Sequence, residues 1–129
     1  MNGKCLLDTN IVIGLFAGEK SIQESMAKTD EIFIPSIVLG ELYFGARKST
    51  NFSENITKID EFASDNFILN CDDNTAREYG RIKDNLRKKG TPIPENDIWI
   101  AATALQHNLT LVSRDAHFSE VDGLKSIRW

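Results

Sequence analysis

Short apolar runs alternate along this chain with longer stretches whose apolar residues recur at helical spacing. This alternation is typical of an α/β fold, in which helices connect the strands of a parallel sheet. The runs mostly lack polar alternation, as expected for strands that are buried on both faces. The predicted strands are residues 4–8, 31–34, 67–70, 110–113 and 124–127. The predicted helices are residues 10–17, 21–28, 36–48, 51–64, 73–89 and 95–107.

The size and composition favour one soluble domain over residues 1–129. No apolar stretch approaches the ~20 residues needed to cross a bilayer, and no secretory signal is apparent, so we predict a cytoplasmic protein. Cys5 and Cys71 lack the close partners of a zinc site and are expected to be free thiols.

Four acidic residues lie at the edges of apolar segments. Asp8 and Asp115 stand at or just past the ends of two predicted strands. Asp97 lies in the first turn of a predicted helix, where the helix dipole favours negative charge. Glu41 lies in the helix that follows the second strand. Because ligands of open parallel sheets bind outside the carboxyl ends of the strands, all four side chains can reach one such point.

Carboxylates are costly to remove from water, so four that converge at the edge of a core need a cation. Hard oxygen ligands without nearby His or Cys suit Mg²⁺ or Mn²⁺. Such an ion can activate a water molecule for attack on phosphorus, which predicts phosphodiester hydrolysis. Thr9, Asn10 and Ser113 are small polar residues near the acids that could orient a metal water.

Each acid alone also has an ordinary explanation. Asp8 could cap the following helix, Asp97 could only complement a helix dipole, and Asp115 could be a turn residue. Glu41 is the hardest to explain in this way, because Val38 and Leu42 beside it are apolar. Four coincidences together are much less probable than one, so we interpret the acids as a group.

The net charge of −4 argues against a general nucleic-acid coat protein. Residues 77–89 nevertheless carry six basic residues against two acidic ones. Such a run usually forms a solvated helix face, and the alternative is a surface that contacts nucleic-acid phosphates through Arg81, Arg87 and Lys88. His107 falls at a helix end and is interpreted as structural. His117 is close to Asp115 and could touch substrate, but a lone histidine in a polar turn more often faces solvent, which is the expectation here.

Four segments carry a specific resemblance to a known family. They are Leu-Leu-Asp-Thr-Asn (6–10), Pro-Ser-Ile-Val-Leu-Gly-Glu-Leu (35–42), Ile-Pro-Glu-Asn-Asp-Ile-Trp-Ile-Ala-Ala (93–102) and Leu-Val-Ser-Arg-Asp-Ala-His-Phe (111–118). In this order and spacing they resemble PIN-domain ribonucleases, specifically the VapC-type toxins of VapBC toxin–antitoxin pairs. The resemblance covers essentially all 129 residues.

The resemblance implies a three-layer α/β/α fold whose parallel sheet has the strand order 3-2-1-4-5. It implies that Asp8, Glu41, Asp97 and Asp115 bind Mg²⁺ or Mn²⁺. It also implies a homodimer, and a cognate antitoxin whose C-terminal segment occupies the active-site groove. Ser113 stands where the family often has Thr, which keeps the hydroxyl. The family has an acid or a His at the position of His117, and the resemblance assigns that residue no firm role.

Other interpretations remain at this point. A receiver-like phosphoacceptor domain also has a parallel sheet and an acidic Mg²⁺ pocket, and Asp72 and Asp73 follow the third predicted strand closely. It leaves Glu41 and Asp97 unexplained. A PIN fold kept only for binding would retain the fold without turnover. A phosphatase that uses Asp8 as nucleophile is disfavoured, because position 10 is Asn rather than a second Asp. No motif specifies the RNA target or the number of metal ions.

Overall fold

A computed structural model describes residues 3–129 and contains one parallel sheet of five strands. The sheet order is β3-β2-β1-β4-β5, and every adjacent pair is parallel. Both the parallel sheet and the order 3-2-1-4-5 are therefore confirmed. The strands are β1 (Lys4–Leu7), β2 (Glu31–Pro35), β3 (Phe67–Leu69), β4 (Thr110–Val112) and β5 (Ser126–Ile127).

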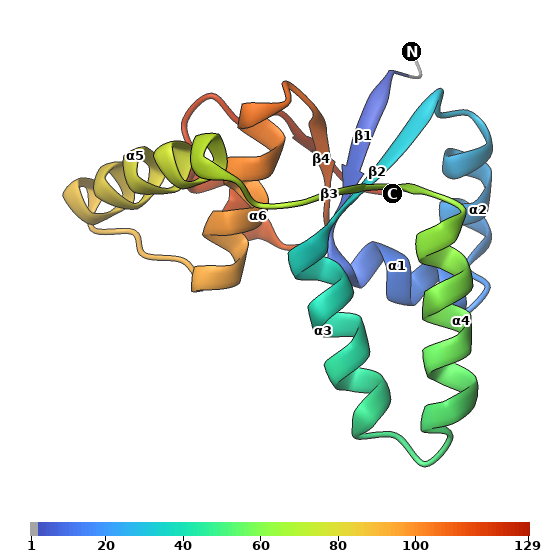
Figure 1. Ribbon diagram of the computed structural model, residues 1–129. Coiled ribbons are helices and arrows are strands. Elements are labelled where there is room, and N and C mark those ends of the chain that lie inside the picture. The colour runs from blue at the N-terminus through green and yellow to red at the C-terminus, as the bar shows by residue number, and fades with distance from the viewer. Residues whose placement is uncertain (1–2) are drawn as a thin grey trace.

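Helices cover both faces of the sheet, which gives the three-layer α/β/α arrangement (Figure 1). In that view α5 and α6 lie to one side of the strands, and α2 and α4 lie to the other. All six predicted helices are present, with ends shifted by at most one residue. They are α1 (Thr9–Phe16), α2 (Lys20–Ala27), α3 (Ser36–Arg47), α4 (Phe52–Ser64), α5 (Asp73–Lys89) and α6 (Glu95–Gln106), and a short 3₁₀ helix, η1 (Ala116–Glu120), precedes β5.

The core is centred on the two middle strands and on one face of α6. Leu6 and Leu7 of β1 and Leu111 and Val112 of β4 have no exposed surface. The face of α6 that meets them is built from small and branched residues, which allow the helix to approach the sheet closely. Its fully buried members are Ile100, Ala101, Ala102 and Ala104.

The two edge strands differ from the prediction. Burial on both faces was expected for every strand, yet Phe67 in β3 is exposed, as are both residues of β5. Strand β5 is also shorter than the predicted segment 124–127. An edge strand has only one neighbour and little helix above it, so an apolar run there is a poor guide to burial.

A capping box fixes the start of α5. The Asp72 side chain accepts a hydrogen bond from the Thr75 backbone N–H at 3.0 Å, and the Thr75 hydroxyl accepts one from the Asp72 N–H at 3.0 Å. The helix ends at Gly90, whose φ of 71° is accessible to glycine at little cost. Asp72 therefore has a structural role, which removes one argument for a phosphoacceptor.

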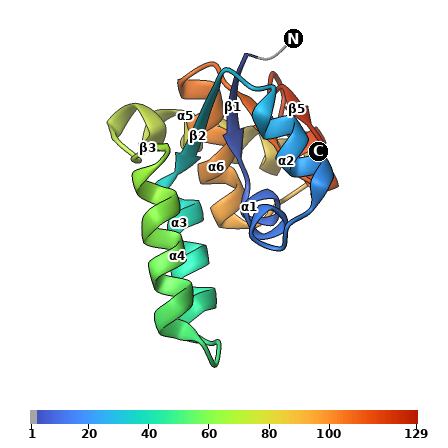
Figure 2. The ribbon, with the colours of Figure 1, turned by 90° about the vertical axis from the view of Figure 1, so that its right-hand side faces the viewer.

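The sheet order separates this fold from the receiver-like alternative. Receiver domains have the order 2-1-3-4-5, in which the third strand lies next to the first. Here β2 lies between β3 and β1. The paired helices α3 and α4 extend side by side beyond the sheet, as both ribbon views show (Figure 2). Within residues 3–129, no helix combines the length and the apolar character that a membrane span requires.

Candidate active site

Asp8 is held at the carboxyl end of the central strand. One of its carboxylate oxygens accepts a hydrogen bond from the Thr9 backbone N–H at 2.9 Å, which caps α1. The other accepts one from the Ser113 hydroxyl at 2.7 Å, and the Asn10 amide lies 3.4 Å from it. The capping explanation for Asp8 is therefore correct as far as it goes. It does not explain why the side chain is only 3% exposed.

Burial raises the pKa values of both Asp8 and Asp97. Burial is the main cause that raises the pKa of Asp8 to about 6, with smaller contributions from the charges of Asp97 and Asp115, while hydrogen bonds from Ser113 and Thr9 oppose it. Burial likewise raises the pKa of Asp97, the contact with His117 opposes this, and the charges of Asp115 and Glu41 add smaller upward contributions. The charges of Asp115 and Glu41 therefore act on the pKa of Asp97, and the charge of Asp97 acts on the pKa of Asp8. The four acids share one electrostatic neighbourhood.

Glu41 connects this neighbourhood to the α3–α4 pair. Its carboxylate accepts a hydrogen bond from the Thr9 hydroxyl at 2.6 Å, which joins α3 to the start of α1. Glu41 also lines two clefts. One, of about 260 Å³, lies among α1, α3 and α4 and includes Ile13 and Leu42. The other, of about 390 Å³, extends from α3 to Asn96 beside Asp97.

Asp115 and His117 complete the open side of the site. The Asp115 side chain is 46% exposed, and its backbone N–H donates to the Ser113 hydroxyl at 3.0 Å. His117 Nε2 is hydrogen-bonded to Asp97 Oδ2 and lies 3.9 Å from Asp115 Oδ2. The expectation that His117 faces solvent is wrong. Phe118, which is 1% exposed, anchors η1 in the core, and the preceding side chain is thereby directed to the acids.

A clasp between distant segments supports the turn that carries Ser113 and Asp115. Arg114 donates two hydrogen bonds to Glu19, at 2.8 and 3.1 Å, and a third to the backbone oxygen of Trp129 at 3.2 Å. Gly14 leaves space for this contact, because a Cβ there would lie 2.8 Å from the Glu19 carboxylate. Nothing in the sequence pattern indicates this clasp, because its partners are 95 residues apart.

Replacing Arg114 with lysine is expected to lower the urea midpoint of unfolding, because an ammonium cannot make the planar two-point contact with Glu19. The matched control is Arg87→Lys, at a solvent-exposed pair with Asp84, where little or no change in the midpoint is expected. Urea denaturation measures both. Equal midpoints for the two variants would show that the clasp contributes no more than a surface pair.

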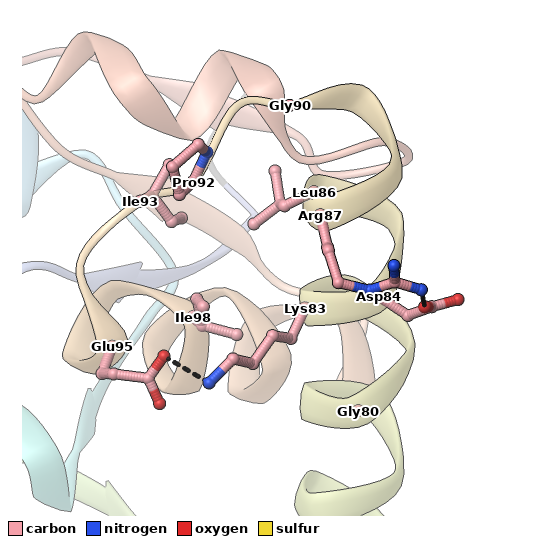
Figure 3. Close-up of a pocket in the computed structure, with 10 residues that line it drawn as sticks. All are labelled: Gly80, Lys83, Asp84, Leu86, Arg87, Gly90, Pro92, Ile93, Glu95 and Ile98. Carbon is pink, nitrogen blue, oxygen red and sulfur yellow. Dashed lines mark hydrogen bonds and ion pairs between the residues drawn. The ribbon is translucent and has the colours of Figure 1, made fainter.

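The three basic side chains of α5 expected to contact RNA are exposed and already paired. Arg81 contacts Glu78, and both Arg87 and Lys88 contact Asp84. A groove of about 610 Å³ lies between this helix and the segment leading into α6, and none of the four site acids lines it. Figure 3 shows Arg87 at its edge, with Lys83 reaching across to Glu95. An RNA contact here therefore stays a prediction.

Comparisons with known proteins agree with this fold. The PIN domain family matches residues 5–124. The chain is 37% identical to Ribonuclease VapC2 from Haemophilus influenzae over 98% of both chains, and 32% identical to the tRNA(fMet)-specific endonuclease VapC from Salmonella typhimurium over 98% of both. Two solved structures are closely similar. VapBC2 from Rickettsia felis bound to promoter DNA has a TM-score of 0.90 at 32% identity, covering 98% of both chains.

The second is DNA-bound VapBC from Salmonella typhimurium, with a TM-score of 0.91 at 31% identity, covering 100% of this chain and 99% of that one. Family, relatives and fold agree over nearly the whole length. The chain belongs to the PIN-domain family and, within it, to the VapC proteins.

Proposed function

We propose that this protein is the ribonuclease toxin of a toxin–antitoxin pair. It hydrolyses RNA phosphodiesters with the help of Mg²⁺ or Mn²⁺ held by Asp8, Glu41, Asp97 and Asp115. The observation that carries the proposal is the burial of Asp8 and Asp97, with raised pKa values, beside two further acids at the end of the sheet. The relatives named ribonuclease or endonuclease VapC support a hydrolase.

The residues present fit a hard divalent cation. Asp8 and Asp97 are buried carboxylates whose pKa values are raised chiefly by burial, so a nearby positive charge would stabilise their ionised forms. Asp115 is exposed and Glu41 half-buried, which leaves one side of the site open to a phosphate group. An oxygen-rich donor set of this kind suits Mg²⁺ or Mn²⁺.

A bound ion of this kind would polarise the scissile phosphate and lower the pKa of a water molecule. The protein's own contribution is orientation. Hydrogen bonds from the Thr9 backbone and the Ser113 hydroxyl hold the two oxygens of Asp8, and the Thr9 hydroxyl holds Glu41. We propose that these contacts, together with Asn10, fix the carboxylates so that little reorganisation accompanies the reaction.

RNA cleavage by the purified protein tests the proposal. We expect cleavage of total RNA in Mg²⁺ or Mn²⁺, no cleavage with excess EDTA, and recovery when the metal is restored. Cleavage that persists in EDTA would contradict the metal requirement. Stable RNA binding with no cleavage in either metal would favour the binding-only PIN fold instead.

We propose that the partner is an antitoxin that covers the clefts beside Glu41. The similar structures are VapBC complexes, and the clefts present exposed apolar side chains, with Ile13 56% and Phe44 64% exposed. An apolar antitoxin segment with an arginine near Asp8 or Asp97 would match this surface, because a guanidinium pairs well with clustered carboxylates. A complex structure without a basic residue near those acids would contradict the arginine.

Charge reversal on α5 tests the RNA-contact prediction. The double variant Arg87→Glu/Lys88→Glu is expected to weaken RNA binding about tenfold and to reduce the salt dependence of binding, with unchanged metal affinity. The matched control, Lys20→Glu/Lys28→Glu, changes the exposed first residue and the exposed C-cap of α2, and makes the same change in net charge on the other side of the sheet. Fluorescence anisotropy at several salt concentrations measures both. Equal effects of the two variants would identify the basic run as an ordinary solvated face.

A further inference from the structure

His117 presents a ring nitrogen to two of the four acids. Its Nε2 is hydrogen-bonded to Asp97 and lies 3.9 Å from Asp115 Oδ2. One candidate ligand atom from each of these three residues lies within 4.8 Å of the others. An ion bound at about 2.1 Å holds adjacent ligand atoms about 3 Å apart. Small side-chain movements would therefore bring all three atoms around one ion.

The backbone directs His117 toward the acids. Phe118, its neighbour in η1, is 1% exposed, and the centres of the two rings lie 5.2 Å apart. Asp97 comes from the first turn of α6 and is 9% exposed. The His117 side chain itself is 34% exposed, so an ion and its remaining waters could reach the ring from the open side.

We propose that His117 Nε2 is a direct metal ligand beside Asp97 and Asp115, and that this nitrogen makes the site favour Mn²⁺ over Mg²⁺. The inference rests on the proposed metal-dependent function. Imidazole is a good ligand for first-row transition metals, whereas Mg²⁺ prefers oxygen and keeps its waters. In the structure this nitrogen and Asp97 Oδ2 are hydrogen-bonded to each other, and both would bind the ion, for which the ring nitrogen must carry no proton.

Pulsed electron paramagnetic resonance of the Mn²⁺-loaded protein tests the proposal without measuring activity. Wild type is expected to show ¹⁴N coupling from a directly bound imidazole, and His117→Gln is expected to lose it. The chain has two histidines, so His107→Gln is the matched control. His107 is exposed at the end of α6, and its replacement should leave the coupling intact.

Metal affinities give a second readout. His117→Gln is expected to weaken Mn²⁺ binding at least about tenfold, while Mg²⁺ binding, measured by competition, changes less than about threefold. His117→Asp restores an oxygen donor, so it should bind Mn²⁺ without ¹⁴N coupling and discriminate less between the two ions. The His117→Asp variant also serves as a control in case His117→Gln fails to fold.

The outcomes separate this inference from the proposed function. Mn²⁺ binding that Asp97→Asn abolishes, but that shows no ¹⁴N coupling in wild type, would overturn the role of His117 and leave the acidic metal site standing. A ¹⁴N coupling that is unchanged in Mn²⁺-loaded His117→Gln would also overturn the role of His117. No Mn²⁺ binding by wild type, or binding that Asp97→Asn leaves unchanged, would overturn both.

Discussion

Replacing Asp97 with asparagine is expected to reduce RNA cleavage by about a thousandfold or more. The change removes the charge of the acid that couples electrically to the other three, and a lost metal ion costs several kcal/mol of transition-state stabilisation. The folded structure should persist, because asparagine has nearly the same shape and a buried charge is removed. Initial rates on a defined RNA, with circular dichroism as a check on folding, measure the effect.

Companion variants make this result specific. Asp8→Asn should match Asp97→Asn, because that carboxylate is also buried, just past the end of β1. Asp115→Asn should lose less, about ten- to a hundredfold, since its side chain is 46% exposed. Asp30→Asn, at an exposed turn, should cleave like wild type. If Asp8→Asn and Asp97→Asn cleave normally, the site has been wrongly assigned.

The metal-free protein is expected to become more stable as the pH falls from 7.5 to 5.5. Asp8 has a folded pKa of about 6, against about 3.9 in an unfolded chain. The folded state therefore binds its proton first, so stability is gained below pH 6 and lost as pH rises through it. Asp8 alone should contribute about 1 kcal/mol over this interval, or about 3–6 °C in melting temperature, and Asp97 acts in the same direction.

Asp8→Asn isolates this effect. At pH 7.5 the variant avoids a buried charge and should be more stable than wild type by about 2–3 kcal/mol. Its stability should also change less between pH 7.5 and 5.5. The acids with lowered pKa values, such as Glu19 and Asp84, lose their contribution only below about pH 4.5, outside this interval. Asp30→Asn should follow wild type, and parallel profiles for all three proteins would show that Asp8 is not held in a destabilising environment.

Much of the site could be predicted because its residues lie at strand and helix ends, which local sequence patterns indicate. Asp8 follows an apolar strand and precedes a helix, and Asp97 lies in the first turn of another helix, two residues after its first residue, Glu95. Parallel strands bring such positions to one edge of a sheet. The strand order itself came from the family resemblance, since the periodicity of the runs indicates only that the strands are parallel.

What could not be predicted depends on contacts between distant segments. His117 meets Asp97 because Phe118 anchors η1, and a histidine in a polar turn carries no sign of that direction. Its spacing from Asp115, with an aromatic residue after it, was the one available signal. Arg114 and Glu19 meet across 95 residues. Such pairs are fixed by packing, which no local pattern records.

The most direct test of the central claim is the position of a bound ion. Crystals soaked in Mn²⁺ and measured at the manganese absorption edge should show an anomalous peak within coordination distance of Asp97, close to Asp8 and Asp115. The peak should be absent from Asp97→Asn crystals treated in the same way. A strong peak elsewhere, or one that Asp97→Asn leaves unchanged, would contradict the view that these carboxylates form the metal site.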